Sequence, residues 1–365
     1  MKAYTIATLG SHSALDVCRG GKDMGFRTLV VVQKGRDKTY TKYFKADSSS
    51  NPLAGCVDEV LVLDEFKDIL SQKVQKQLMD KNCIFIPHRS FEVYINDYEA
   101  IENKFKVPIF GNRFLLKCEE RGVKPNQYDL FDEANIRYPK QFKSAKEIER
   151  LCLVKVLEKE RGFERAFFLV ENYQQYKLES EDRLLKGLIT EDQLKESVIE
   201  EFIIGVQVNF NFFYSPVSKR LELIGTDTRR QTNIEGLIKT PAPLQKSIME
   251  KVSIRYEEAG HIAVTVLESL LEDAFLMAEK FVKASEGLYP PGVIGPFGLQ
   301  TMIIPGPPKK EIIVFDVSPR MPGSPGIFST PYSGYLFGQN ISMGKRVAME
   351  IRDAVEKGEL KKILT

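Results

Sequence analysis

Short apolar runs alternate with helix-like segments along the first third of the chain. Five runs have the composition of strands buried on both faces: residues 4–9, 28–32, 56–63, 83–87 and 107–110. After the first run, residues 14–25 carry apolar side chains at helical spacing. Strands separated by helices predict a parallel, doubly wound sheet, the arrangement of α/β domains. In such a sheet, ligands bind beyond the carboxyl ends of the strands.

The rest of the chain has the pattern of an antiparallel sheet with helices packed on it. An alternating aromatic run at residues 208–214 and an apolar run at 221–224 predict a hairpin, followed by a polar loop at 228–233. The runs at 301–304 and 312–315 predict a second hairpin. Further strands are expected at residues 151–154 and 198–204, and helices at 179–197, 267–284 and 342–351.

Polar residues follow three of the predicted strands in the first third. Ser11 and His12 lie in a turn that opens a helix, where free backbone N–H groups attract an anion. Arg36 follows the second strand and Ser90 follows the fourth. Because these strand ends share one edge of the sheet, we predict a site for an anionic small molecule there. The same residues also fit ordinary roles in a helix cap, a solvated loop and a polar turn.

The segment 311–320 (EIIVFDVSPR) combines a buried strand with oxygen ligands. Asp316 follows the apolar run and Ser318 lies two residues later, so both side chains are on one side of the strand. Carboxylate and hydroxyl oxygens suit Mg²⁺, which leaves its other positions to phosphates and water. Arg320 has the planar fork that binds phosphate or carboxylate. The alternative is a polar turn, with Asp316 as a cap and Arg320 paired to a surface acid.

Composition narrows the function classes. The 365 residues carry 43% hydrophobic and 28% charged side chains with a net charge of +2, which suggests two or three domains and argues against a general nucleic-acid binder.

No apolar run reaches transmembrane length and the N-terminus does not resemble a signal peptide, so we expect a cytoplasmic protein without a membrane partner. Five cysteines without a CxxC pair fit reduced thiols, and three histidines show no metal-ligand spacing. The absence of Trp beside abundant Lys and Glu is typical of a thermophile.

The motifs at these positions resemble a known family. In chain order they are TIATLGSHS, KGRD, IPHRSF, VPIFGNR, EEFIIG, FFYSP, ESLL, IGPFGLQ, FDVSPR and ISMGKR. This series is similar to that of the archaeal formate-dependent FAICAR synthetases, ATP-grasp ligases of purine biosynthesis. The resemblance implies a doubly wound domain at residues 1–122, followed by an ATP-grasp fold of two α+β subdomains at 123–204 and 205–365.

The resemblance also implies roles for individual residues. Lys155 and Arg320 would act at the transferring phosphate, and Gln300 and Asp316 would hold Mg²⁺ or Mn²⁺. The ribonucleotide AICAR would bind at Ser11, His12, Arg36, Ser90 and Asn233. ATP would bind at Lys155, Glu200, Glu201, Phe202 and Gln207. Formate would attack ATP to give formyl phosphate, and the amine of AICAR would then take up the formyl group, in a homo-oligomeric enzyme.

Two departures from the family pattern leave a second hypothesis open. The expected glycine-rich phosphate loop has only Gly162 within residues 158–165 and contains three carboxylates, which repel a polyphosphate. Asp129 occupies the place of a lysine that these ligases put near the nucleotide. The alternative is therefore a divergent paralogue that binds a phosphorylated ribonucleotide but has lost or altered its ATP-dependent activity.

Overall fold

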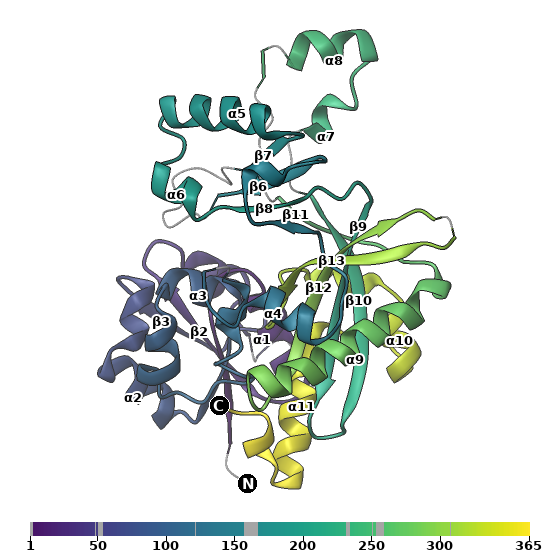
Figure 1. Cartoon of the computed structure of the whole chain (residues 1–365). Coiled ribbons are helices and arrows are strands. Elements are labelled where there is room, and N and C mark those ends of the chain that lie inside the picture. Colours follow the sequence, from purple (N-terminus) through teal and green to yellow (C-terminus); the bar gives the residue numbers. More distant parts are fainter. Residues whose placement is uncertain are drawn as a thin grey trace.

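The computed structural model describes residues 3–47, 49, 54–120, 122–156, 167–230, 234–249, 251–252, 259–306 and 308–365, which form three sheets. Figure 1 shows a parallel sheet at lower left, a large antiparallel sheet at right, and a small antiparallel sheet above them. The predicted fold class is confirmed.

The strands are β1 (Thr5–Leu9), β2 (Arg27–Gln33), β3 (Glu59–Leu63), β4 (Cys83–Ile86), β5 (Gln141–Phe142), β6 (Cys152–Lys155), β7 (Phe167–Val170), β8 (Val198–Glu201), β9 (Val206–Ser215), β10 (Arg220–Arg230), β11 (Gly260–Ala263), β12 (Gly295–Ile304) and β13 (Glu311–Ser318). The α-helices are α1 (Ala14–Asp23), α2 (Gln72–Asp80), α3 (Arg89–Ile95), α4 (Gln127–Glu133), α5 (Tyr173–Leu185), α6 (Glu191–Lys195), α7 (Ile234–Leu237), α8 (Ala242–Met249), α9 (Leu271–Leu288), α10 (Tyr332–Phe337) and α11 (Met343–Lys357).

The first sheet has the order β3-β2-β1-β4, and all its strands are parallel. The fifth predicted strand, residues 107–110, does not join it as a strand. This part of the chain makes only isolated bridges, from Ile109 to Phe85 and from Phe110 to Leu364. Pro108 has no N–H to donate and the backbone turns at Gly111 with φ of 108°, so a longer ladder cannot form.

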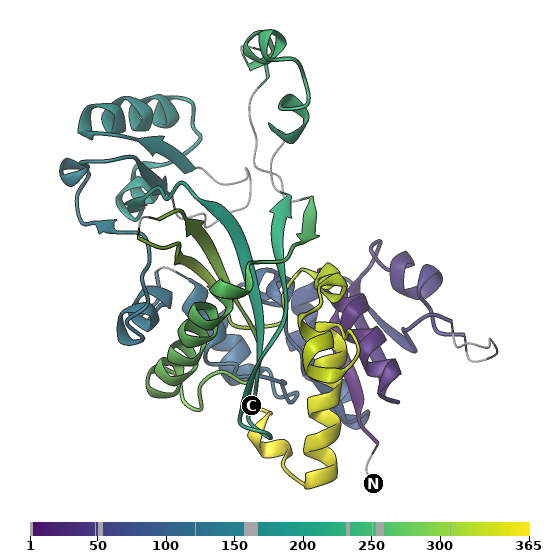
Figure 2. The same cartoon turned by 90° about the vertical axis from the view of Figure 1, so that its right-hand side faces the viewer.

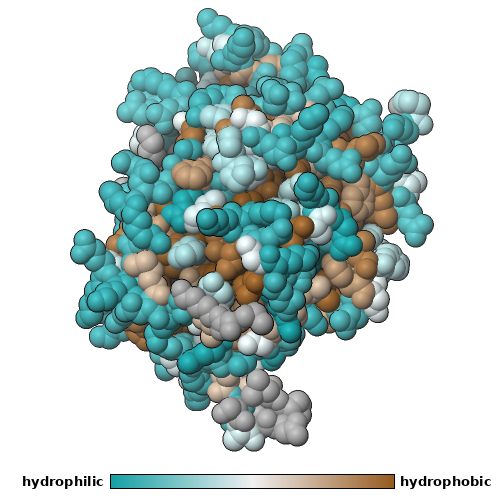
Figure 3. Space-filling view, turned by 90° about the horizontal axis from the view of Figure 1, so that it is seen from below, coloured by the Kyte–Doolittle hydropathy of each residue, from teal (hydrophilic) through white to brown (hydrophobic). Residues whose placement is uncertain are grey.

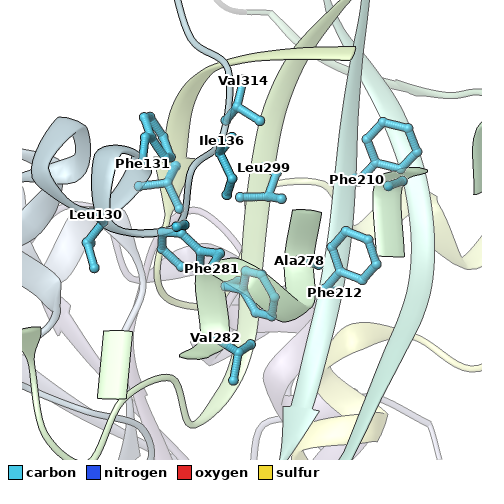
Figure 4. Packing of buried hydrophobic residues seen from close by; sticks show 14 of the residues in the cluster. Leu130, Phe131, Ile136, Phe210, Phe212, Ala278, Phe281, Val282, Leu299 and Val314 are labelled. Atoms are coloured by element: carbon cyan, nitrogen blue, oxygen red, sulfur yellow. The ribbon is translucent and has the colours of Figure 1, made fainter. Parts of the chain in front are cut away.

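The second sheet has the order β11-β10-β9-β12-β13 and is antiparallel. One face is aromatic, with Phe210, Phe212 and Phe297 buried against helix α9. Figure 4 shows Phe210 and Phe212 in the same core as Phe281 of α9 and Phe131 of α4. The predicted loop at 228–233 is wrong for its first residues, because β10 continues to Arg230 by pairing with β11, a partner that the apolar pattern did not reveal.

The third sheet has the order β5-β8-β6-β7, with its own small core. Figures 1 and 2 agree that it stands above the other two sheets, with α5 across its outer side. Helices α7 and α8, between β10 and β11 in the chain, project from the top of the molecule. The small sheet thus faces the strand ends of the first domain and the upper part of the second sheet.

The first and last helices pack together at two glycines. A Cβ atom on Gly20 of α1 would overlap the backbone of Gly344 in α11, and one on Gly344 would overlap the carbonyl group of Asp16. Apolar residues of α11, including Val347 and Ile351, join Ile6 and Ile84 of the first sheet in one buried cluster. The C-terminal helix is therefore part of the first domain's core.

Replacing Gly344 with alanine should destabilise the protein by about 1–3 kcal/mol, because the added methyl group forces the two helix backbones apart. Urea unfolding measures the loss. Gly287→Ala in α9 is the matched control, because its Cβ would meet no atom within 4 Å. That variant should be neutral or up to about 1 kcal/mol more stable. Equal unfolding midpoints for the two variants would contradict the packing argument.

The outer surface is mixed, and Figure 3 shows a lower face of mainly hydrophilic side chains with hydrophobic patches between them. The five cysteines are all buried free thiols. Among the residues that the structure describes, no helix combines the length and the apolar character needed to cross a bilayer.

Candidate active site

A row of polar side chains crosses the second sheet on the face opposite its aromatic core. In the strand register, Asp316 of β13 is opposite Gln300 of β12, Gln300 is opposite Asn209 of β9, and Asn209 is opposite Asp227 of β10. Directly opposed residues point to the same face. The row is therefore continuous across four strands. It includes the predicted pair Gln300 and Asp316, which the hairpin places side by side.

Asp227 is the centre of a buried hydrogen-bond network in this row. Its carboxylate accepts from Asn209 Nδ2 at 2.9 Å and from Asn211 Nδ2 at 2.6 Å, and it lies 2.5 Å from His261 Nδ1. Only 1% of Asp227 is exposed. Because an ionised carboxylate only accepts, these contacts fix the orientation of the two amides. A buried network of this kind rigidifies the face that it lines.

The edge of the first sheet lines the other side of the candidate site. Ser90 Oγ, at the start of α3, lies 3.1 Å from Ser11 Oγ, just after β1. The ring of His12 stacks on that of His88 with centroids 5.2 Å apart. Part of His12 remains exposed, although burial, the largest cause, and nearby basic side chains that include Arg320 and Arg229 lower its pKa. Since Arg229 belongs to the second sheet, His12 lies near that sheet.

A loop of the second domain packs against His12. A Cβ at Gly323 would lie 2.5 Å from His12 Nε2, so only glycine allows the backbone this close. Met321, two residues earlier, bridges to His88, and the 3-10 helix η7 (Pro325–Ser329) follows. This segment thus lies against His12, a predicted substrate residue.

His88 is buried and neutral, and it makes stability depend on pH. Its Nε2 donates to the carbonyl oxygen of Leu9 at 2.9 Å, while Nδ1 has no hydrogen-bond partner among the described residues. Burial, the largest cause, lowers the pKa of His88 from 6.5 to about 4. Below pH 6.5 the unfolded chain takes up a proton that the folded protein does not.

The stabilisation from neutral His88 is therefore present above pH 6.5 and is lost as the pH falls through about 4. We expect the free energy of unfolding to drop by up to about 3 kcal/mol over this range from His88 alone. Urea unfolding of the wild type and of His88→Gln at pH 7 and pH 4.5 measures it. The variant should lose less stability between the two pH values, and an equal loss in both proteins would show that His88 is not the cause.

Arg320 lies in a buried ion cluster between the domains. Its Nε donates to Glu92 at 3.2 Å, and its NH2 group donates to both oxygens of Glu119 at 2.9 Å. Arg89 also pairs with Glu92 and Glu120. Burial is the main cause that raises the pKa of Glu92 to about 7. The guanidinium group of Arg320, which was predicted to act on phosphate, is thus bound by two carboxylates. Its positive charge also contributes to the lowered pKa of His12.

Lys155 is the predicted phosphate-binding residue on the small sheet. Its ammonium group pairs with Glu200, which also accepts from Tyr128 at 3.1 Å, and both charged side chains are almost fully buried. Glu201 instead points outward to Arg150 at 3.3 Å, and the Phe202 N–H donates to the carbonyl of Leu151. The predicted nucleotide residues of β6 and β8 are therefore adjacent, but their side chains divide between the two faces.

Gln207 lies two residues before Asn209 on β9, so it shares the face of the polar row. Arg36 contacts α3, the helix that also carries Ser90. Its guanidinium lies over the rings of Phe66 and Tyr94 and donates to the Tyr94 hydroxyl at 2.9 Å.

Two predictions fall on residues that the structure does not describe. Asn233 and the altered loop 158–165 both lie outside the described residues. Asp129 is described, and its carboxylate has a local role. It accepts from the Asn126 N–H at the start of α4 and pairs with Lys124 at 2.9 Å.

The donor set at Gln300 and Asp316 fits a hard divalent cation. Gln300 is 4% exposed, and its Oε1 has no hydrogen-bond partner among the described residues. Oxygen ligands from an amide and a carboxylate are those that Mg²⁺ accepts, with phosphates and water completing its shell. No group of three or more His, Cys, Asp or Glu side chains in the described part of the chain could hold a metal. Such a site would therefore need ligands from a bound nucleotide.

Several residues of the site were not found from the sequence. Asn209, Asn211 and Asp227 belonged to no motif, and His88 lay in the motif IPHRSF without a predicted role. One signal was present, because the strand VNFNFFY places asparagine at alternate positions to phenylalanine. Two asparagines at alternate positions of a strand indicate a polar face. The aromatic residues between them dominate the pattern, so this face was not predicted.

Comparison with known proteins decides the family. Two family models match: "Protein of unknown function (DUF1246)" over residues 6–142 and "Domain of unknown function (DUF1297)" over residues 175–365. A 5-formaminoimidazole-4-carboxamide-1-(beta)-D-ribofuranosyl 5'-monophosphate (FAICAR) synthetase of Methanopyrus kandleri is 36% identical, covering 100% of this chain and 96% of the relative. The enzyme of that name from Methanothermobacter thermautotrophicus is 38% identical, covering 99% and 94%.

The chain belongs to the FAICAR synthetase family. A solved structure titled as the IMP biosynthesis protein PurP from Thermococcus kodakaraensis is 29% identical, with a TM-score of 0.72, covering 99% of this chain and 100% of that one. The ADP complex of the N5-carboxyaminoimidazole ribonucleotide synthetase purK has a TM-score of 0.56 at 12% identity, covering 88% of this chain and 71% of that one. At that identity the likeness shows the ATP-grasp fold alone. The predicted family is confirmed.

Proposed function

We propose that this FAICAR synthetase homologue joins formate to the exocyclic amine of AICAR at the expense of ATP, on the route to IMP. The observation that carries the proposal is similarity at 34–38% identity, over almost the whole chain, to enzymes named for this product. The site has the parts that the reaction needs. The edge of the first sheet carries serine and histidine side chains. The polar row of the second sheet, on the other side of the domain boundary, carries a carboxylate and an amide.

The chemistry divides into two steps. A formate oxygen attacks the γ-phosphorus of ATP, the bond to the β-phosphate oxygen breaks, and ADP leaves. The amine of AICAR then attacks the formyl carbon, the carbon–oxygen bond breaks, and phosphate leaves with the electron pair while the amine gives up a proton. A divalent cation, when bound, neutralises charge on the transferring phosphoryl group.

The residues of this chain have positioning and electrostatic roles in that scheme. Ser11, His12 and Ser90 hold the ribonucleotide at the edge of the first sheet. Gln300 and Asp316 hold the cation. Lys155, paired with Glu200 on the small sheet, binds the phosphates. Such fixed groups in a partly closed site stabilise developing charge without reorganising.

The test is an assay of the purified protein with formate, Mg-ATP and AICAR. FAICAR, ADP and phosphate should appear in equal amounts, and omission of any substrate should stop all three. No FAICAR above a heat-killed control would refute the proposal. Calorimetric titration with Mg-ATP addresses the paralogue hypothesis separately, because a paralogue without ligase activity would bind AICAR but not the nucleotide. Cytoplasmic location and a homo-oligomeric state remain part of the proposal.

A further inference from the structure

Two buried amide oxygens lie side by side in the polar row. Asn209 of β9 and Gln300 of β12 are directly opposed in the strand register, and they are 5% and 4% exposed. Neither Asn209 Oδ1 nor Gln300 Oε1 has a hydrogen-bond partner among the described residues. A buried acceptor left without a donor costs about 1–3 kcal/mol, so two neighbouring ones are a feature that requires an explanation.

The contacts of the two amide nitrogens determine where these oxygens point. Asn209 Nδ2 donates to Asp227 on the β10 side, and a carboxylate cannot donate in return, so Oδ1 is turned away from β10. Gln300 Nε2 lies 3.3 Å from Ser318 Oγ on the β13 side, which turns Oε1 away from β13. Both oxygens therefore face the strip between β9 and β12. Two acceptors that converge in a buried place attract a donor or a cation.

A carboxylate lies one strand further along the row. Asp316 is opposite Gln300 on the far side, and the chain is irregular at this point of the β12–β13 pair. The row thus presents three oxygen-bearing side chains in sequence across three adjacent strands. Hard divalent cations prefer this ligand chemistry.

We propose that Asn209 Oδ1 supplies a further oxygen ligand, beside Gln300 and Asp316, to a divalent cation bound with the nucleotide. The inference rests on the proposed use of a cation by this site. It adds a residue that the sequence motifs did not contain. The contact with Asp227 holds the amide in the orientation that binding requires, because the nitrogen is already engaged.

The test measures cation binding without turnover. Mn²⁺ replaces Mg²⁺, and electron paramagnetic resonance counts free Mn²⁺ in the presence of protein and a non-hydrolysable ATP analogue. Asn209→Ala should weaken Mn²⁺ binding about tenfold or more. Binding of the analogue without metal, followed by calorimetry, should be unchanged.

Asn211→Ala is the matched control. Asn211 is on the same strand and face and also donates to Asp227, at 2.6 Å, but its Oδ1 lies 3.5 Å from the hydroxyl of Ser324. Both variants lose one hydrogen bond to Asp227, so they share any general loosening of the network. Only Asn209→Ala should lose cation affinity.

Three outcomes would overturn the inference. The first is equal Mn²⁺ affinity in the wild type and Asn209→Ala, and the second is the same loss in both variants. The third is weaker AICAR binding by Asn209→Ala with Mn²⁺ affinity unchanged, which would assign the oxygen to the ribonucleotide. A protein that binds Mn²⁺ through Asn209 but makes no FAICAR would refute the proposed reaction and leave this ligand in place.

Discussion

Replacing Asp316 with alanine should lower the kcat of FAICAR formation about 100-fold or more, with little change in the affinity for AICAR. Asp316 is the one carboxylate in the row beside Gln300, so its loss leaves the cation with neutral protein ligands. The charge on the transferring phosphoryl group is then poorly neutralised. Steady-state kinetics at saturating substrates, with product measured by chromatography, tests this expectation.

The loss of activity should depend on the Mg²⁺ concentration and on which residue of β13 is replaced. Raising Mg²⁺ tenfold should recover part of the activity of Asp316→Ala if weak metal binding is the cause. Glu311→Gln, at the other end of β13 and paired with Arg137 at the surface, is the control and should keep wild-type activity. Full activity in Asp316→Ala would remove this carboxylate from the mechanism. An equal defect in Glu311→Gln would show that β13 is simply sensitive to change.

Replacing Arg346 with methionine should destabilise the protein by about 3–5 kcal/mol. Arg346 of α11 is buried, donates to Glu222 of β10 at 2.5 Å and to Glu350 at 3.0 Å, and lies over the ring of Phe213 at 4.1 Å. Methionine keeps most of the volume but removes the cation between two buried carboxylates. Glu222 then keeps its pair with Arg220, at 2.6 Å, and Glu350 keeps hydrogen bonds from Ser215 and Val217. The cost comes from this lost compensation of buried charge rather than from a cavity.

Urea unfolding measures this loss, and the same helix offers the control. Arg352→Met breaks an exposed pair with Glu356 at 3.1 Å, and it should change stability by about 0.5 kcal/mol or less. Adding Glu350→Gln to Arg346→Met should restore part of the lost stability, because it removes the buried charge that Arg346 compensated. A loss below about 1 kcal/mol in Arg346→Met would contradict the argument.

Local pattern was enough to predict the parts of the site that one hairpin joins. Gln300 and Asp316 lie on strands connected by a short turn, so alternation and register place them together. Four of the five strands predicted in the first third form the parallel sheet, because buried parallel strands have a strong apolar signature. The family motifs added the ATP-grasp architecture.

Pairings between distant segments could not be predicted in this way. Arg320 was expected to bind phosphate, yet its fork contacts Glu92, which is 228 positions away in the sequence. Asn209 meets Gln300 only because β9 and β12 pair across the intervening β10, β11 and α9. No periodicity within a segment specifies which distant strand becomes its neighbour. The proposed boundaries at residues 122 and 204 remain a prediction.

The glycine contact between α1 and α11 has a consequence for how the protein is made. The first sheet leaves the ribosome with the surface around Ile6 and Ile84 uncovered, because the helix that buries it is encoded some 300 residues later. At ordinary elongation rates this delay is on the order of 15–60 s. A nascent chain in that interval exposes this apolar surface, and it should bind holding chaperones until α11 has been made.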